Sequence, residues 1–275
     1  MTLKARRRTY WFAFFCSLAM LIVAAVLSFV LLRRQHVPIF LAEHGIYKTY
    51  MFFGIRISSL VLSIGNVLVT CLLSVVLSAT VLRTFQKTVS PEVYFFVFWV
   101  ASCAFEAMRL VSLVAGITGA SDTVISVYAK IYVASKVFGL LTLFISGLHA
   151  AGLRNEKHFS MILTALGVSA ALAAIMPVNT GIWEATLMYR IGYEKLFIEV
   201  VGFVFLVTVL CYFGAVSVRG DKAYYFAAGG ILSVMVGTSF LSMDVSPLAT
   251  LIAVVLIMVG GILYITRLHG YYLWQ

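Results

Sequence analysis

The sequence predicts an all-α fold, a polytopic transmembrane helical bundle of about eight spans. Of its 275 residues, 63% are hydrophobic and 11% are charged, whereas soluble domains average about 45–50% apolar and about 25% charged residues. Uncharged apolar stretches of about 20 residues, the length that crosses a bilayer, also recur along the chain. So few polar residues could not cover a water-soluble core. This excludes a soluble enzyme, a disordered chain and a fibrous protein.

The first span, about 9–32, is expected to be a retained signal-anchor helix. It follows a basic cluster at residues 4–8 and ends at Arg33 and Arg34. A cleaved signal peptide has a shorter apolar core of about 7–15 residues and ends at small residues. We therefore interpret this segment as an anchor helix that precedes a seven-helix unit.

The seven-helix unit is expected to contain spans at about 57–82, 93–117, 126–153, 159–183, 195–218, 223–243 and 245–266. The last three spans are joined by short turns, one of which places Pro247 in the first turn of a helix, where proline is well tolerated. Gly-Gly-Ile-Leu at 229–232 recurs at 260–263 between otherwise unlike sequences. We interpret this recurrence as chance and not as an inverted repeat.

Two connections carry structural signals of their own. In the outer loop 33–56, apolar residues at 40, 47, 50, 51 and 54 share one helical face. They predict a short amphipathic helix in the outer interface or capping the bundle. Between the fifth and sixth spans, Trp183, Tyr189 and Tyr193 lie beside charged residues. Such aromatic residues are typical of the membrane–water interface.

Charge sets the expected orientation. The net charge is +10, and with the N-terminus inside, the inner segments hold more Lys and Arg than the outer loops. By the positive-inside rule both termini are cytoplasmic. The sequence has no N-x-S/T sequon, which favours a multi-pass protein of the bacterial inner (cytoplasmic) membrane. The basic residues then contact lipid headgroups, and no nucleic-acid partner is expected.

Glu106 and Arg109 are the strongest candidates for a functional site, because each lies inside the third span. A charged side chain at mid-span costs about 2.5–3.5 kcal/mol on insertion scales. At positions i and i+3 the two share a helix face and can form a structural ion pair. Lys136 in the fourth span is expected at the depth of Glu106, about 15 Å from the outer end. The alternative is therefore a ligand-binding layer.

Two further residues are candidates for this polar layer. The second span carries small polar residues on one face, at Ser59, Ser63, Asn66, Thr70, Ser74 and Ser78. Such a stripe usually marks a close helix–helix contact, and the alternative is one wall of a wet cavity that includes Asn66. Glu199 lies about one turn inside the outer end of the sixth span, either as an interfacial carboxylate or as part of the layer.

Three functions remain open. The first is a receptor-like or small-ligand-binding unit, similar in span count and orientation to the membrane-embedded sensor regions of some bacterial signalling proteins. It would take a zwitterionic or anionic ligand and relay its signal through a membrane or cytoplasmic protein, since no output domain is expected. A small-solute or proton-coupled transporter and a structural subunit of a membrane complex are the alternatives. The sequence shows no catalytic or metal-binding motif, so we expect no cofactor, and an enzyme is not favoured.

Overall fold

The computed structural model describes residues 3–34, 36–52, 55–85, 90–153, 157–243 and 246–273. In this part of the chain, eight helical segments are long and apolar enough to cross a membrane, which confirms the predicted bundle. Seven of the eight are single helices: α1 (Leu3–Arg33), α3 (Ser59–Thr84), α6 (Asp122–Ala150), α7 (His158–Ile175), α8 (Glu194–Arg219), α9 (Ala223–Met243) and α10 (Pro247–Leu273). The predicted start of the last span, residue 245, lies outside the described residues.

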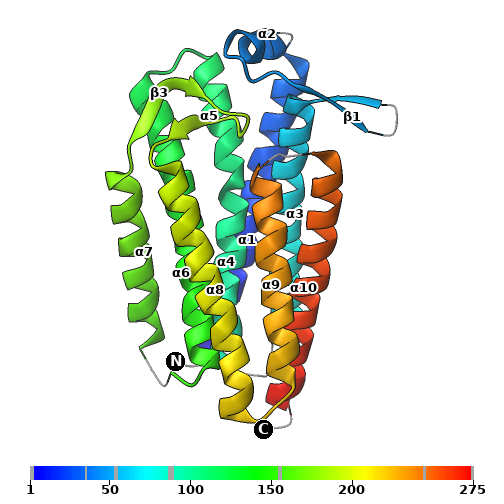
Figure 1. Ribbon diagram of the computed structural model, residues 1–275, viewed down its shortest axis with the longest axis vertical. Helices are drawn as coiled ribbons and strands as arrows, with labels where there is room; N and C mark the ends of the chain where they lie inside the picture. The colour runs from blue at the N-terminus through cyan, green and yellow to red at the C-terminus, as the bar shows by residue number, and fades with distance from the viewer. Residues whose placement is uncertain are drawn as a thin grey trace.

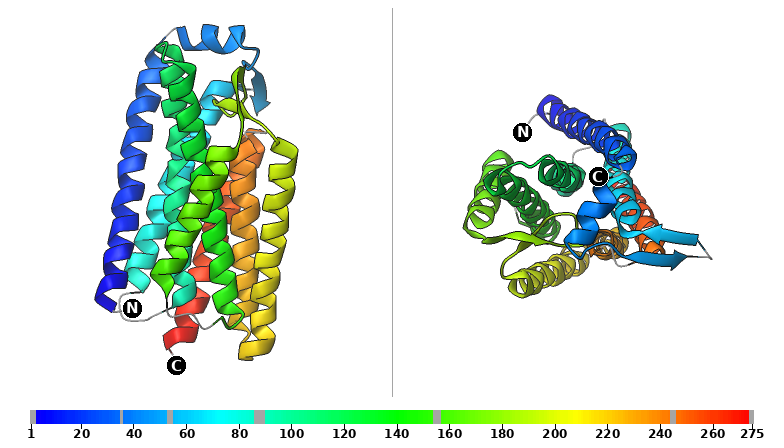
Figure 2. Two further views of the ribbon diagram at one scale, coloured as in Figure 1. Left: turned by 90° about the vertical axis from the view of Figure 1, so that its left-hand side faces the viewer. Right: turned by 90° about the horizontal axis from the view of Figure 1, so that it is seen from above.

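The remaining span is built in three pieces. Helix α4 (Pro91–Cys103) is followed by a 3₁₀ segment, η1 (Ala104–Ala107), and by α5 (Met108–Ile117). At its start, Ser90 caps the helix by accepting a hydrogen bond from the backbone N–H of Val93. Helix α4 lies at the centre of the bundle and packs against α1, α3 and α6 (Figure 2).

The two ends of the bundle differ (Figure 1). Both chain termini lie at one end, which we call the terminus end. The opposite end carries helix α2 (His36–Glu43) and two antiparallel hairpins, and we call it the lid end. One hairpin pairs β1 (Thr49–Phe52) with β2 (Ile55–Ser58), and the other pairs β3 (Val178–Trp183) with β4 (Tyr189–Ile191). Apolar side chains cover much of the surface between the ends, as lipid contact requires.

In the outer loop 33–56, the positions for which a helix is expected do not share one: of the five, only residue 40 lies in helix α2. Tyr50 and Met51 lie in a strand, paired with Ile57 and Arg56. The run from Thr49 to Ile57 is rich in β-branched and aromatic residues, which prefer strands. Position 54 lies outside the described residues.

The predicted fifth span, 159–183, is too long. Helix α7 ends at Ile175, and residues from Val178 onward form β3. Pro177 explains the boundary, because a proline restricts the residue before it to extended backbone. Met176 has φ −65° and ψ 123° accordingly. The predicted aromatic belt is also only partly present, since Trp183 and Tyr189 are buried and Tyr193 is exposed.

Helices α9 and α10 cross where the two Gly-Gly-Ile-Leu sequences meet. A Cβ atom on Gly230 would lie 2.7 Å from the carbonyl oxygen of Gly260, and one on Gly260 would lie 2.6 Å from that of Gly230. Only glycine allows backbones to approach this closely, a common device in membrane helix pairs. The recurrence therefore serves packing between the two helices.

Gly230→Ala is expected to destabilise the protein by about 1–3 kcal/mol, because the added methyl group forces α9 and α10 apart. The adjacent Gly229→Ala is the matched control, since a Cβ atom there meets nothing within 4 Å. Unfolding in a detergent titration measures both variants. Equal effects at the two positions would contradict the proposed close contact.

Candidate functional site

The candidate site is centred on the break in the third span. Glu106 lies inside η1 and Arg109 lies in the first turn of α5. The two side chains are 2% and 1% exposed, so their charges are removed from solvent. A short 3₁₀ stretch inside a long helix often marks a functional hinge. Here the 3₁₀ segment contains Glu106 and lies next to Arg109, the two side chains whose charges are most costly to place inside the span.

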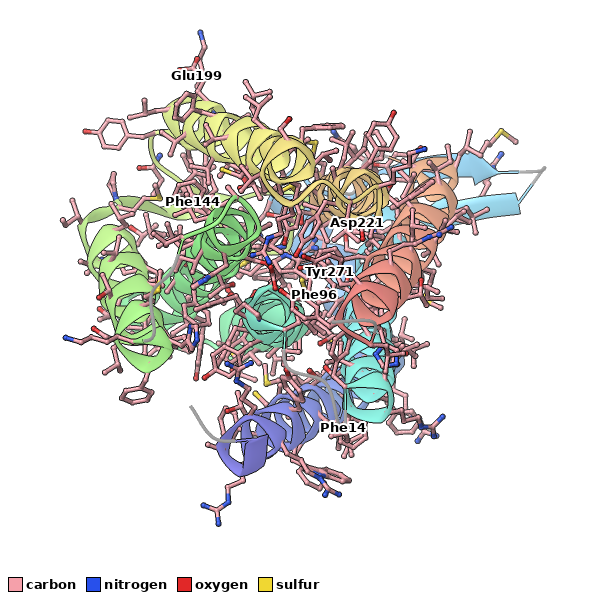
Figure 3. All side chains as sticks on the ribbon, turned by 90° about the horizontal axis from the view of Figure 1, so that it is seen from below. Phe14, Phe96, Phe144, Glu199, Asp221 and Tyr271 are labelled. Atoms are coloured by element: carbon pink, nitrogen blue, oxygen red, sulfur yellow. The ribbon has the colours of Figure 1, made fainter. Side chains whose placement is uncertain are left out.

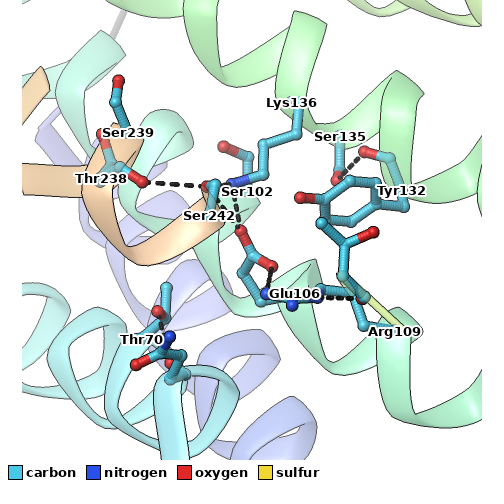
Figure 4. A network of polar contacts seen from close by, with 12 residues as sticks. Thr70, Ser102, Glu106, Arg109, Tyr132, Ser135, Lys136, Thr238, Ser239 and Ser242 are labelled. Atoms are coloured by element: carbon cyan, nitrogen blue, oxygen red, sulfur yellow. Dashed lines mark hydrogen bonds and ion pairs between the residues drawn. The ribbon is translucent and has the colours of Figure 1, made fainter. Parts of the chain in front are cut away.

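Glu106 contacts two cations (Figure 4). Its Oε1 atom is paired with Nζ of Lys136 from α6, and its Oε2 atom lies 3.4 Å from Nη1 of Arg109. Ser242 of α9 is the fourth member of this group: its hydroxyl accepts a hydrogen bond from Lys136 at 2.8 Å and lies 3.3 Å from Glu106 Oε1. We call these four residues the layer. The structure thus brings Glu106, Arg109 and Lys136 together from two spans, with α9 adding a hydroxyl group that sequence patterning did not single out.

The other two predicted site residues have different positions. Asn66 is 1% exposed, and its Oδ1 accepts a hydrogen bond of 2.8 Å from Thr250 on α10. It belongs to the buried polar face of α3, where Ser74 donates to the carbonyl oxygen of Val100 at 2.6 Å. This face is a close helix–helix contact. Glu199 is exposed and points away from the bundle (Figure 3), so the structure does not place it in the layer.

The turn between β3 and β4 covers the layer at the lid end. Nε of Arg109 donates a hydrogen bond of 2.7 Å to the carbonyl oxygen of Thr186, and Ser63 donates one of 3.2 Å to that of Ala185. Trp183 packs edge-on against Phe40 of α2, with ring centroids 5.4 Å apart. We call residues 178–191 the lid. Because Arg109 contacts both Glu106 and the lid, displacing one partner must affect the other.

Tyr189 fastens the lid to α6. Its hydroxyl donates a hydrogen bond of 2.7 Å to Oδ1 of Asp122. Burial, together with this carboxylate, raises the pKa of Tyr189 from 10.0 to about 12. A raised pKa means that the folded state favours the neutral phenol. The contact is therefore fully present below pH 10 and is lost as the pH rises through about 12.

Tyr189→Phe is expected to loosen the lid by about 1 kcal/mol, the usual worth of one hydrogen bond. Tryptophan fluorescence can report this, because the ring centroids of Trp183 and Tyr189 are 4.7 Å apart. The wild-type signal should change near pH 12, and that change should be absent in the variant. Tyr193→Phe, at an exposed position nearby, should behave as wild type. A transition that persists in Tyr189→Phe would refute the assignment.

A second polar network lies at the terminus end and was missed by sequence reasoning. Glu92, in the first turn of α4, is 0% exposed. Its carboxylate accepts hydrogen bonds from Tyr272 at 2.8 and 3.0 Å and from Tyr224 at 3.1 Å. Nη2 of Arg219 lies 3.4 Å away, and Ser90 donates at 2.9 Å. We call this set the Glu92 network.

The Glu92 network extends across the bundle through hydroxyl groups. Ser146 of α6 donates to the carbonyl oxygen of Glu92 at 2.8 Å and lies 2.6 Å from the hydroxyl of Tyr212. Tyr212 in turn lies 2.7 Å from the hydroxyl of Tyr264. Helices α4, α6, α8, α9 and α10 are thus joined at this end. In the sequence, Glu92 follows Ser90-Pro91 and is easily taken for an exposed first-turn acid.

A narrow cavity of about 10 Å³ separates the two networks, enough for roughly one water molecule. It is lined by the polar face of α3 and by α4, α9 and α10, through Thr70, Ser74, Trp99, Cys103, Thr238 and neighbouring apolar residues. A space of this size has no room at that point for a solute larger than water.

No known protein family, curated protein or solved structure matches the chain. Within the described residues, no three His, Cys, Asp or Glu side chains gather as metal ligands. The buried polar layer and the elements that enclose it are therefore the features from which a function can be inferred.

Proposed function

We propose that the chain is a receptor-like membrane unit that binds a small anionic or zwitterionic ligand at Glu106, Arg109 and Lys136. One observation carries this proposal: a buried carboxylate faces two cations at a helix break, directly under a lid that one of the cations holds. A ligand carboxylate would compete with Glu106 for Lys136 and Arg109, and a ligand ammonium group would pair with Glu106. Charge-assisted hydrogen bonds of this kind are among the strongest in proteins.

The surface beside the lid suits a ligand that carries negative charge. An open pocket of about 490 Å³ lies between β4 and the start of α8 and is lined in part by Lys195 and by Arg190, which is also paired with Glu184 at 3.6 Å. Clefts with one sign of charge raise the local concentration of the opposite sign and speed association. This pocket offers a first docking place from which an anion could reach the layer when the lid opens.

A ligand acts as a signal only if it binds two conformations with different affinities. The hinge at η1 supplies a bistable element, because Glu106 lies inside it. Release of Glu106 from Lys136 would allow η1 to rewind, and α4 would carry the change to the Glu92 network. A membrane or cytoplasmic partner protein at that end would read the change.

Thermal stability tests the proposal directly. The full-length protein in detergent is screened with α-amino acids and small mono- and dicarboxylates at millimolar concentration. At least one class should raise the melting temperature of the wild type, and Lys136→Met should abolish that rise. Lys130→Met is the matched control on the same helix, because Lys130 donates to the carbonyl oxygen of Ala174, outside the layer. If Lys130→Met abolished the rise in melting temperature as fully as Lys136→Met, the assignment of the site would be wrong.

Transport of a small solute, or of a solute with a proton, is the second candidate function. It is favoured by the discontinuous third span, because discontinuous helices often form the substrate sites of transporters. Buried polar networks toward both ends of the bundle also fit alternating access. Flux into proteoliposomes, with and without a proton gradient, distinguishes transport from reception. A stoichiometric partner after mild-detergent purification would instead favour a receptor or a structural subunit.

Orientation and location belong to the same proposal. We expect the terminus end, with both chain termini, on the cytoplasmic side of the bacterial inner membrane, and the lid on the outside. A reporter fused after residue 120, at the lid end, should be active only in its periplasmic form. Cytoplasmic activity at that position would reverse the orientation and refute ligand entry from outside.

A further inference from the structure

Buried polar atoms without a hydrogen-bond partner gather at the terminus end, where α1, α4, α6 and α7 meet. In the part of the chain that the structure describes, these atoms are Nε and Nη1 of Arg6, the hydroxyl of Tyr10, Nε2 of His149 and Nδ1 of His158, and the one other such atom is the Ser112 hydroxyl on α5. The four side chains at the terminus end are at most 9% exposed. Folded proteins satisfy nearly all such groups, so this terminus-end cluster calls for a partner beyond the described chain.

The cluster is continuous in space. The Arg6 guanidinium lies 5.9 Å from the centre of the Tyr94 ring, and that ring lies 6.1 Å from His158. The rings of His158 and His149 are 5.2 Å apart. Tyr10 interacts electrostatically with both Arg6 and Tyr94. The unpartnered atoms of α1, α6 and α7 therefore surround the start of α4.

The chemistry of these groups selects an anion. A guanidinium group offers only donors and stays protonated, a phenol donates, and the His158 imidazole can donate through one nitrogen. The His149 ring already donates to the backbone of Leu153, so it borders the cluster without adding a donor. A metal ion is disfavoured, because the two imidazoles lie beside the Arg6 charge. Glu92, which interacts electrostatically with His149, is already held by Arg219 and two tyrosines. Within the described residues, the donors of the cluster therefore have no carboxylate partner.

We propose that the terminus-end cluster binds a phosphate group, carried either by a lipid headgroup or by a small soluble phosphate. Several donors come from α1 and one from α7, which suits a tetrahedral group with several oxygens better than a planar carboxylate. Arginine pairs readily with phosphate. The cluster also lies at an end of the bundle, and α1 carries the exposed Arg7 and Arg8 beside it. This site is separate from the layer at Glu106.

Two binding arms distinguish the sources of phosphate. In the first, native mass spectrometry of the full-length protein compares phosphatidylglycerol with a phosphate-free galactosyl diacylglycerol. In the second, the melting temperature is measured with inorganic phosphate against chloride at equal ionic strength. Preference in the first arm identifies a headgroup site, and a rise in the second identifies a soluble phosphate site. No preference for phosphate in either arm overturns the proposal.

Matched variants locate the site. Arg6→Gln should weaken phosphate binding at least about tenfold, as expected for loss of a buried charge-assisted contact, and Arg7→Gln, its exposed neighbour, should not. Equal losses would indicate diffuse surface attraction and overturn the site. Tyr10→Phe removes one hydroxyl and keeps the ring, so it remains decisive if Arg6→Gln fails to fold. Unchanged binding in Tyr10→Phe would then refute the cluster.

Discussion

Glu92→Leu is expected to destabilise the bundle by about 3–5 kcal/mol, the usual cost of removing one partner of a buried ion pair. The substitution would leave the partly buried Arg219 guanidinium without its carboxylate, with the carbonyl oxygens of Ala150 and His149 as acceptors. It would also leave the hydroxyls of Tyr224 and Tyr272 without their acceptor. Unfolding free energies from a detergent titration measure the effect, provided that the variant is expressed and folded.

Tyr272→Phe is the graded control for Glu92. It removes one donor and keeps the ring, so a loss of about 1 kcal/mol is expected. The double variant with Glu92→Leu should then cost little more than Glu92→Leu alone, because the two groups act together. Simple additivity of the two losses would show that Tyr272 and Glu92 are energetically independent, contrary to the geometry.

Glu106→Gln is expected to cost a similar 3–5 kcal/mol, because it leaves Lys136 and Arg109 without their buried carboxylate. The partner change Lys136→Met should be milder, since Glu106 keeps its contact with Arg109. Combining the two substitutions should recover part of the loss. Lys136→Met removes one of the two cations that Glu106→Gln alone leaves without their carboxylate. A double-mutant cycle measured by unfolding gives this coupling.

The cycle also separates structure from function. If the layer were only structural, the double variant would regain stability and keep any ligand response. The proposed ligand site predicts recovered stability with the ligand-induced rise in melting temperature still absent. Recovery of both would contradict the proposed function and leave a structural ion pair.

The spans and the charged layer could be predicted from the sequence because both follow from simple physics. Long apolar runs have few other stable environments than a bilayer. Glu106, Arg109 and Lys136 stand out because a charge inside such a run is costly. Helix depth, at a constant rise per residue, then places Glu106 and Lys136 at one level. The pairing across α4–η1–α5 and α6 needed no knowledge of the tertiary structure.

The lid and the Glu92 network could not be predicted in the same way. Whether Trp183 and Tyr189 lie in the interface or fold back over the bundle depends on contacts with α2 and α6. Glu92 sits at a helix start, where an exposed acid is the ordinary expectation. Its burial is set by Tyr224 and Tyr272, more than 130 residues away in the chain. The opposite error arises at Glu199, which is exposed. Its position near the end of a span does not indicate whether its side chain faces the bundle or points away from it.

The 3₁₀ segment makes the third span longer and more tightly wound than a continuous α-helix of the same residues. A 3₁₀ helix rises about 2.0 Å and turns about 120° per residue, against about 1.5 Å and about 100° in an α-helix. Rewinding the four residues of η1 as α-helix would shorten the span by about 2 Å and rotate its two halves by about 80° relative to each other. Glu92 and Arg109 lie on opposite sides of this segment. A change in the winding of these four residues would therefore turn the Glu92 carboxylate at the terminus end relative to the Arg109 guanidinium under the lid.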